Sequence, residues 1–139
     1  MTRTVIFDYD GTIHNTLGIY EPAFREAYGW LIKQGVVEEK QIESAQIASF
    51  LGLNSKEMWD LFLPKLDQSY KDQASRMVGE AMVRRIKEHR AVWYPGAERM
   101  LMTLKERGYH LLILSNCKIA YREAHWKEFG MERWFDRFY

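Results

Sequence analysis

The stretch Val5–Thr12 constrains the fold more than any other part of the sequence. It begins with the apolar run Val5–Phe7 and continues with Asp8 and Asp10, which one residue separates, followed at once by a glycine and a threonine. Successive apolar residues, two of them β-branched, are typical of a short strand buried on both faces of a parallel sheet. Because open α/β sheets bind ligands at the carboxyl ends of their strands, we expect both aspartates at a binding edge.

The two aspartates have the chemistry that phosphoryl transfer needs. Side chains repeat with period two along a strand, so Asp8 and Asp10 project the same way if the pleat persists. One carboxylate can attack phosphorus as a nucleophile, and the other can protonate the leaving oxygen and then deprotonate water. Gly11 lets the backbone approach an anion, and Thr12 adds a hydroxyl and an N–H group. The alternative is an ordinary acidic turn after a strand.

These residues resemble a known family. Asp8–Thr12 resembles motif I (Asp-x-Asp-Gly-Thr) of the haloacid dehalogenase-like (HAD) hydrolases, a superfamily made mostly of phosphatases. The strand-like run Leu111–Leu114, which Ser115 and Asn116 follow, resembles motif II, and Tyr94–Ala97 resembles the lead-in to the preceding helix. The order and spacing resemble the subgroup with a helical cap inserted after motif I, relatives of phosphoglycolate phosphatase and β-phosphoglucomutase.

The resemblance implies an α/β fold with a Rossmann-like parallel sheet and an all-helical cap. The HAD-like core is expected in residues 1–15 and 93–139, and the cap in residues 16–92. The family's motif III lysine and motif IV acidic residues have no counterpart in this sequence. We therefore expect an incomplete core, and a chain that is the N-terminal part of a longer hydrolase. Made alone, it is expected to bind Mg²⁺ weakly, to hydrolyse phosphate esters poorly or not at all, and to aggregate.

The resemblance also implies roles for individual residues. Asp8 would be the nucleophile that forms an aspartyl-phosphate, and Asp10 the general acid and base. Mg²⁺ would be held by the Asp8 carboxylate and the backbone carbonyl of Asp10, together with motif IV acids. Ser115 would donate a hydrogen bond to a phosphoryl oxygen, with help from Asn116. Their alternative role is turn chemistry at a strand end.

A loop of the expected cap is a further candidate for substrate binding. Related caps place a substrate loop where Gly52–Lys56 lies, so Lys56 could meet a phosphate or carboxylate group. A helix–helix turn with a solvated lysine is an equal alternative.

Apolar periodicity predicts four helices in the insert and an alternation of helices and strands after it. The first helix starts at an N-cap at Asn15 or Thr16 and ends at Gly35. A start signal at Asn54, with Glu57 three residues later, precedes the third helix. The predicted helices are 16–35, 38–50, 55–63, 67–89, 95–108 and 121–129, and the predicted strands are 5–7, 109–114 and, more briefly, 134–139.

Charge and composition exclude several partners. A net charge of +1, from 20 basic and 19 acidic residues, gives no electrostatic case for nucleic acid or an anionic membrane. No apolar run approaches the ~20 residues of a membrane span, and no signal peptide is recognisable. The single cysteine, Cys117, excludes an internal disulfide and is consistent with a reducing cytoplasm. We expect its side chain to be a buried apolar group. Of the four histidines, none forms a zinc-type pair, and His14 is expected to be an exposed loop residue near Asp10.

The sequence thus favours a Mg²⁺-dependent phosphatase of a small phosphorylated metabolite, acting through an aspartyl-phosphate in the cytoplasm. A phosphomutase of the same family is an alternative, because the same two aspartates serve phosphoryl transfer between sugar positions. Haloacid dehalogenation is disfavoured by Asp10, which those relatives lack. A catalytically incomplete fragment or binding module is the remaining alternative. The substrate and the oligomeric state are left open.

Overall fold

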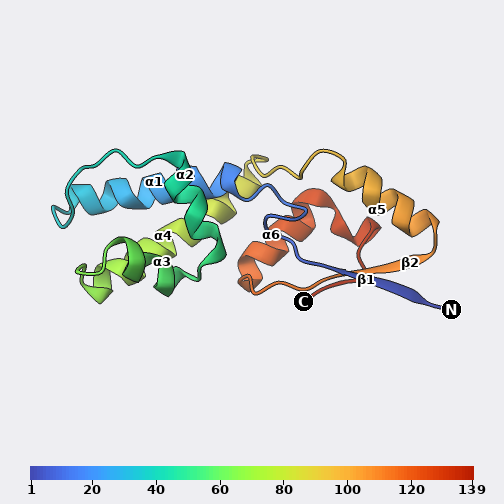
Figure 1. The fold of residues 1–139 in the computed structure, drawn as a ribbon. Coiled ribbons are helices and arrows are strands. Elements are labelled where there is room, and N and C mark those ends of the chain that lie inside the picture. Colours follow the sequence, from blue (N-terminus) through green and yellow to red (C-terminus); the bar gives the residue numbers. More distant parts are fainter. The chain divides into compact units, whose positions relative to one another are not determined.

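The computed structural model describes residues 1–139 and divides the chain into two compact units. One unit consists of residues 1–18 and 83–139, and the other of residues 19–82. The boundaries fall within α1 (Leu17–Lys33) and near the end of α4 (Gln68–Lys87), so each of these helices contributes residues to both units (Figure 1). No helix is both long enough and apolar enough to cross a membrane.

The first unit is built on a parallel sheet in the order β1-β2-β3. Its strands are β1 (Arg3–Phe7), β2 (Tyr109–Ile113) and β3 (Arg137–Phe138), and its helices include α5 (Ala97–Glu106) and α6 (Ile119–Phe129). The third strand is shorter than the predicted range. Phe7 pairs with Ile113, and Ile113 with Phe138, so the carboxyl ends of all three strands lie at one edge of the sheet.

The prediction that the first strand is buried on both faces is wrong. Ile6 is 62% exposed and Leu114 equally so, whereas Val5 and Phe7 pack against the buried core. Side chains alternate between the faces of a strand, and in this chain the core packs on only one of them. The residues that form this core come from α5, β2 and the chain's last nine residues, with two from the loop after β1: Tyr9, Ile13, Ala97, Leu101, Leu111, Ile113, Met131, Trp134, Phe135 and Phe138.

Glycines end the helices of this unit as the sequence predicts. Gly130 caps α6 in the left-handed conformation, with φ +54°, and its N–H donates to the carbonyl of Lys127. Gly108, with φ +80°, follows the C-cap of α5 and leads directly into β2. A residue with a Cβ is strained in this conformation, so glycine at these positions sharpens both helix ends.

The second unit is all-helical and contains α2 (Ser44–Ser49), a 3₁₀ turn (Phe50–Gly52) and α3 (Ser55–Phe62) along with most of α1 and α4. An aromatic cluster forms its centre. Phe24 is fully buried, and its ring lies 5.5–6.3 Å from five others, those of Tyr20, Tyr28, Phe50, Trp59 and Phe62. The predicted capping box is confirmed, because the Asn54 side chain accepts from the Glu57 N–H and the Glu57 carboxylate accepts from the Asn54 N–H.

The second predicted helix is much shorter than residues 38–50. Residues 38–43 have no regular secondary structure, and α2 covers only Ser44–Ser49. Side chains from α1 occupy the carbonyls in the irregular part: the Tyr28 hydroxyl donates to Glu38 at 2.6 Å, and Arg25 donates to Ile42 at 2.9 Å. These tertiary hydrogen bonds satisfy backbone acceptors that a helix would otherwise use.

Candidate active site

The loop after β1 is held tightly by its own backbone. The Tyr9 carbonyl accepts hydrogen bonds from the N–H groups of Thr12, Ile13 and His14, at 2.9–3.2 Å. Gly11 has φ +77°, and its N–H donates to the His14 carbonyl at 2.9 Å and to the Thr16 hydroxyl at 3.1 Å. The turn therefore needs a residue that tolerates the left-handed region. Gly11 and Thr12 are both expected to bind phosphate, and in the structure their N–H groups donate hydrogen bonds within this loop.

The loop is also tied to the segment that precedes α5. The Asn15 N–H donates to the Val92 carbonyl at 2.8 Å, and the Tyr94 N–H donates to the Ile13 carbonyl at 2.9 Å. Tyr9 and Ile13 are fully buried in the core. Two buried side chains and two backbone hydrogen bonds thus hold the loop that carries both aspartates in place.

The two aspartates have different surroundings. Asp8, the first residue after β1, is exposed, and its carboxylate accepts a long hydrogen bond of 3.5 Å from the Thr12 hydroxyl. Asp10 is half-buried, and its Oδ1 atom accepts from the Tyr121 hydroxyl at 2.6 Å, from His14 Nδ1 at 2.9 Å and from the Thr16 hydroxyl at 3.0 Å. Asp8 is therefore accessible to a ligand, and Asp10 is held in place.

Hydrogen bonds to the Asp10 carboxyl lower its pKa by more than burial raises it. Burial alone raises the pKa of this carboxyl, but hydrogen bonds from His14, Tyr121 and Thr16, with the charge of His14, bring the pKa below its ordinary value. Tyr121 responds in the opposite direction: burial and the negative charge of Asp10 raise the pKa of its hydroxyl. At neutral pH the pair is a carboxylate and a neutral phenol donor.

A buried cluster of imidazole and phenol groups lies behind Asp10. His14 is fully buried, so the expectation of an exposed loop histidine is wrong: the loop folds inward and stacks the ring on Tyr9. The His14 and His125 rings lie 4.4 Å apart. Trp93 donates to the Tyr9 oxygen at 2.9 Å, which leaves the Tyr9 proton for His125 Nδ1 at 2.7 Å. Both Nε2 atoms are buried without a partner.

Burial controls the protonation of His125. Desolvation, followed by repulsion from His14, lowers the pKa of the His125 imidazole to about 3. Ligand atoms of Asp10, His14 and His125 lie within 4.8 Å of one another, so this group has the composition of a metal-binding cluster. In the structure its Asp10 and His14 members already satisfy each other through the 2.9 Å hydrogen bond.

The same loop has two oxygen groups that could bind a hard cation. The Asp8 carboxylate is exposed and takes part in no ion pair. None of the loop's backbone hydrogen bonds ends on the Asp10 carbonyl oxygen. An exposed carboxylate and a carbonyl without a backbone hydrogen bond are ligands that Mg²⁺ accepts, so these two residues fit the metal that the resemblance implies.

Ser115 and Asn116 follow β2 at the same edge of the sheet as Asp8. The Leu114 N–H donates to the Phe7 carbonyl at 2.9 Å, and the Ser115 N–H donates to the Tyr139 carbonyl at 3.0 Å. These bonds continue the parallel pairing past the strand ends and place Ser115 beside the start of the aspartate loop. Ser115 is half-buried and Asn116 exposed.

Cys117 is only half-buried, which differs from the expectation of a buried side chain, and burial raises the pKa of its thiol. Lys56 lies in the first turn of α3, after the N-cap Asn54, within the helix predicted for residues 55–63. Its side chain is 77% exposed and pairs with Asp60 at 2.6 Å. A role of Lys56 in substrate binding stays a prediction.

Sequence reasoning misses three residues of the site. The sequence indicates Thr16 only as a possible helix cap, whereas its hydroxyl bonds both Asp10 and Gly11. Tyr121 and His125 lie one helical turn apart on α6 and both face the aspartate loop. Their spacing of four residues, just after the Ser115 segment, is the available signal, because it places two polar rings on one helix face.

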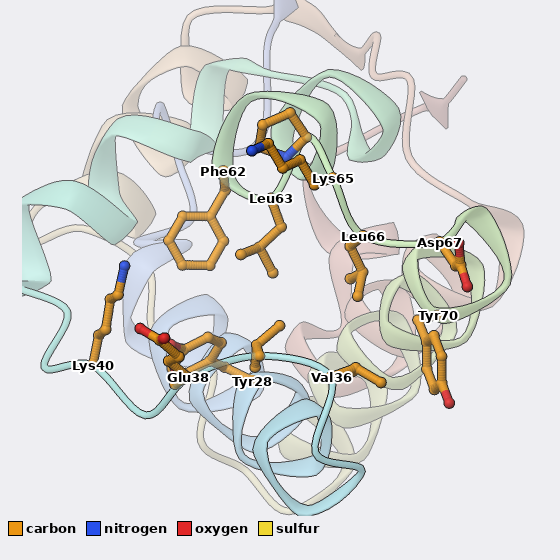
Figure 2. A pocket seen from close by; sticks show the side chains of 12 residues that line it. Tyr28, Val36, Glu38, Lys40, Phe62, Leu63, Lys65, Leu66, Asp67 and Tyr70 are labelled. Atoms are coloured by element: carbon orange, nitrogen blue, oxygen red, sulfur yellow. The ribbon is translucent and has the colours of Figure 1, made fainter.

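A cavity of about 520 Å³ lies entirely within the helical unit. Figure 2 shows Phe62, Leu63 and Leu66 on one side of it and Tyr28 and Val36 on the other. Lys40 and Lys65 stand at its rim, with Glu38 and Asp67. The cavity therefore has apolar walls and a rim of mixed charge.

The fold and the site define the class of protein. A parallel α/β sheet carries two carboxylates on the loop after β1, next to a serine on the loop after β2, with a helical unit between the two strands in sequence. The haloacid dehalogenase-like hydrolase family matches residues 5–139, and the chain belongs to this family. Among curated proteins, none matches the sequence.

Solved structures share the fold over nearly the whole chain. A predicted phosphoglycolate phosphatase from Haemophilus somnus has a TM-score of 0.78 and 19% identity, and CbbY from Rhodobacter sphaeroides, in complex with phosphate, has 0.75 and 22%. A haloacid dehalogenase-like hydrolase from Streptococcus pneumoniae has 0.73 and 19%. Each match covers 99% of this chain but only 60–63% of the other, so the chain spans about three fifths of their length.

Proposed function

We propose that this chain carries the nucleophile and the general acid–base of a Mg²⁺-dependent phosphatase that acts on a small phosphorylated metabolite. The observation that carries the proposal is the contrast between the two aspartates. Asp8, at the carboxyl end of β1, is exposed and accepts one long hydrogen bond, while Asp10, two residues later, is held by three donors. An accessible nucleophile next to an oriented proton carrier suits two-step phosphoryl transfer.

In the first step an Asp8 carboxylate oxygen attacks phosphorus, and the bond from phosphorus to the substrate oxygen breaks. Asp10 is a carboxylate in the unliganded chain, and the negative charge of a bound phosphate would favour its protonated form. This form gives its proton to the departing oxygen, which leaves as an alcohol. In the second step the Asp10 carboxylate takes a proton from water as the water oxygen attacks the aspartyl-phosphate. Inorganic phosphate leaves, and the Asp8 carboxylate and the Asp10 acid are regenerated.

Other residues of the chain would bind the phosphate. Ser115 and Asn116 would donate hydrogen bonds to its oxygens, and Gly11 and Thr12 would keep the loop close to it. Mg²⁺, held by the Asp8 carboxylate and the Asp10 carbonyl, would neutralise phosphoryl charge. Lys56 would meet an anionic group of the substrate. The cytoplasm is the proposed compartment.

The neighbours favour a small phosphorylated substrate. CbbY was solved with phosphate, and a mutant of it with xylulose 1,5-bisphosphate. Because identity to these structures is only 21–22%, they support the substrate class rather than a particular compound. A phosphomutase would use the same two aspartates, and isomerisation of a sugar phosphate without net phosphate release would identify it.

The test is phosphate release from a panel of alkyl and aryl phosphates with Mg²⁺, together with intact-mass detection of a phosphoryl adduct. Because this sequence lacks a motif III lysine and motif IV acids, we expect slow phosphate release, with a hydroxylamine-sensitive adduct that Asp8→Asn abolishes. Asp72→Asn, on α4 of the other unit, is the matched control and should behave as the unmutated chain. Wild-type turnover by Asp8→Asn would refute the assignment. Substrate binding with no adduct or turnover would favour the binding-module alternative.

A further inference from the structure

All three hydrogen bonds from the protein to the Asp10 carboxylate end on the same oxygen. Tyr121, His14 and Thr16 donate to Oδ1, and no bond from the chain ends on Oδ2. We propose that Tyr121 is a positioning residue for Asp10, and that it leaves Oδ2 as the oxygen that exchanges protons with substrate and water. This inference rests on the proposed function, in which Asp10 is the acid and base.

Tyr121 differs from the other two donors in where it comes from. His14 and Thr16 belong to the same loop as Asp10 and move with it. Tyr121 lies on α6, 111 residues away in sequence, and its hydrogen bond of 2.6 Å is the shortest of the three. The Tyr121 bond therefore fixes the carboxylate relative to the sheet and to α6, which bonds within the loop cannot do.

The Tyr121 ring is itself well anchored. It is 8% exposed and makes an edge contact with His125, at 4.5 Å between ring centroids. His125 in turn stacks on Phe129 and bonds the Tyr9 hydroxyl. Arg122, the next residue, donates to the Phe138 carbonyl at 3.2 Å, which ties the first turn of α6 to β3. The hydroxyl thus has a defined position from which to hold Oδ1.

Removing this hydroxyl leaves His14 and Thr16, which move with the loop, as the donors to Oδ1, so the carboxylate is no longer fixed relative to α6. The Asp10 carboxylate would then occupy a wider range of positions relative to the substrate, and the proton would be aligned for transfer in fewer complexes. Misorientation of a catalytic group lowers turnover more than ground-state binding. We expect Tyr121→Phe to lower kcat about tenfold or more for alkyl phosphates, which need a proton on the leaving oxygen, and to leave KM unchanged. An activated aryl phosphate should lose much less in the first step.

The matched control is Tyr28→Phe. Tyr28 is 7% exposed and donates a hydrogen bond of the same length, 2.6 Å, to a backbone carbonyl in the helical unit. Both variants lose one buried hydroxyl, but only Tyr121→Phe loses a bond to Asp10. Equal losses of kcat in the two variants, or equal losses of kcat/KM of Tyr121→Phe on alkyl and aryl substrates, would overturn the proposal, because kcat/KM reports the first step alone.

A second measurement does not depend on turnover. The γ-carbon NMR signal of Asp10, in the whole chain labelled at aspartate, should shift in Tyr121→Phe and stay in place in Tyr28→Phe. The ζ-carbon signal of Tyr121 should shift in Asp10→Asn, which requires no tyrosine variant to fold. Unchanged signals would overturn the positioning contact. Shifted signals in a chain without phosphatase turnover would support the contact and count against the proposed function.

Discussion

The buried imidazole of His125 should make the stability of the sheet-containing unit fall as the pH is lowered. Its pKa is about 3 in the folded chain, against an ordinary value of 6.5. The unfolded chain therefore binds a proton at pH values where the folded chain does not. The stabilisation is fully present above pH 6.5 and is lost progressively as the pH falls from there toward 3.

The size of this effect follows from the two pKa values. Proton uptake by the unfolded state is about one quarter complete at pH 7 and nearly complete at pH 5, while the folded state stays neutral at both. The resulting loss in the free energy of unfolding between pH 7 and pH 5 is about 2 kcal/mol. Urea denaturation at the two pH values, followed by tryptophan fluorescence, measures it.

Two variants isolate this contribution. His125→Gln cannot titrate in this range, and its side-chain oxygen can still accept from Tyr9, so its pH difference should be smaller than that of the unmutated chain by about 2 kcal/mol. His110→Gln, at an exposed position on β2, should keep the full difference. An unchanged pH difference in His125→Gln would refute the assignment of a depressed pKa to His125.

Three further predictions concern the helical unit. Asn54→Ala removes the N-cap of α3 and should destabilise this unit by about 1 kcal/mol in urea denaturation, and an effect near zero would contradict the capping geometry. Phe24→Ala empties the aromatic centre and should cost about 3–5 kcal/mol, whereas the matched Leu61→Ala at an exposed position should cost less than about 0.5 kcal/mol. Lys56→Ala should raise KM for anionic metabolites more than for a small generic phosphate. Lys65→Ala, at another exposed lysine, is the control. Equal KM changes for both kinds of substrate would show that Lys56 is a solvated lysine without a role in substrate binding.

Local patterns in the sequence determined the order of elements and the place of the aspartates. The apolar run before Asp8 predicts a strand, the start signal at Asn54 a helix N-cap, and the glycine after α6 a helix end. Each of these patterns spans only a few residues, because caps and left-handed turns depend on the chemistry of the residues that form them. The resemblance of Asp8–Thr12 to motif I likewise depends on five consecutive residues. Short stretches of sequence are therefore sufficient to predict these features.

Only the tertiary structure decided the surroundings of these residues. The exposure of Ile6 depends on which sheet face the core covers, and the short α2 depends on α1 side chains that occupy its neighbouring carbonyls. The burial of His14 and the bond from Tyr121 to Asp10 join segments that are far apart in sequence. Periodicity reports the face on which a side chain lies, whereas its partner and its solvent exposure, which set its pKa and its orientation, are fixed by packing between distant elements.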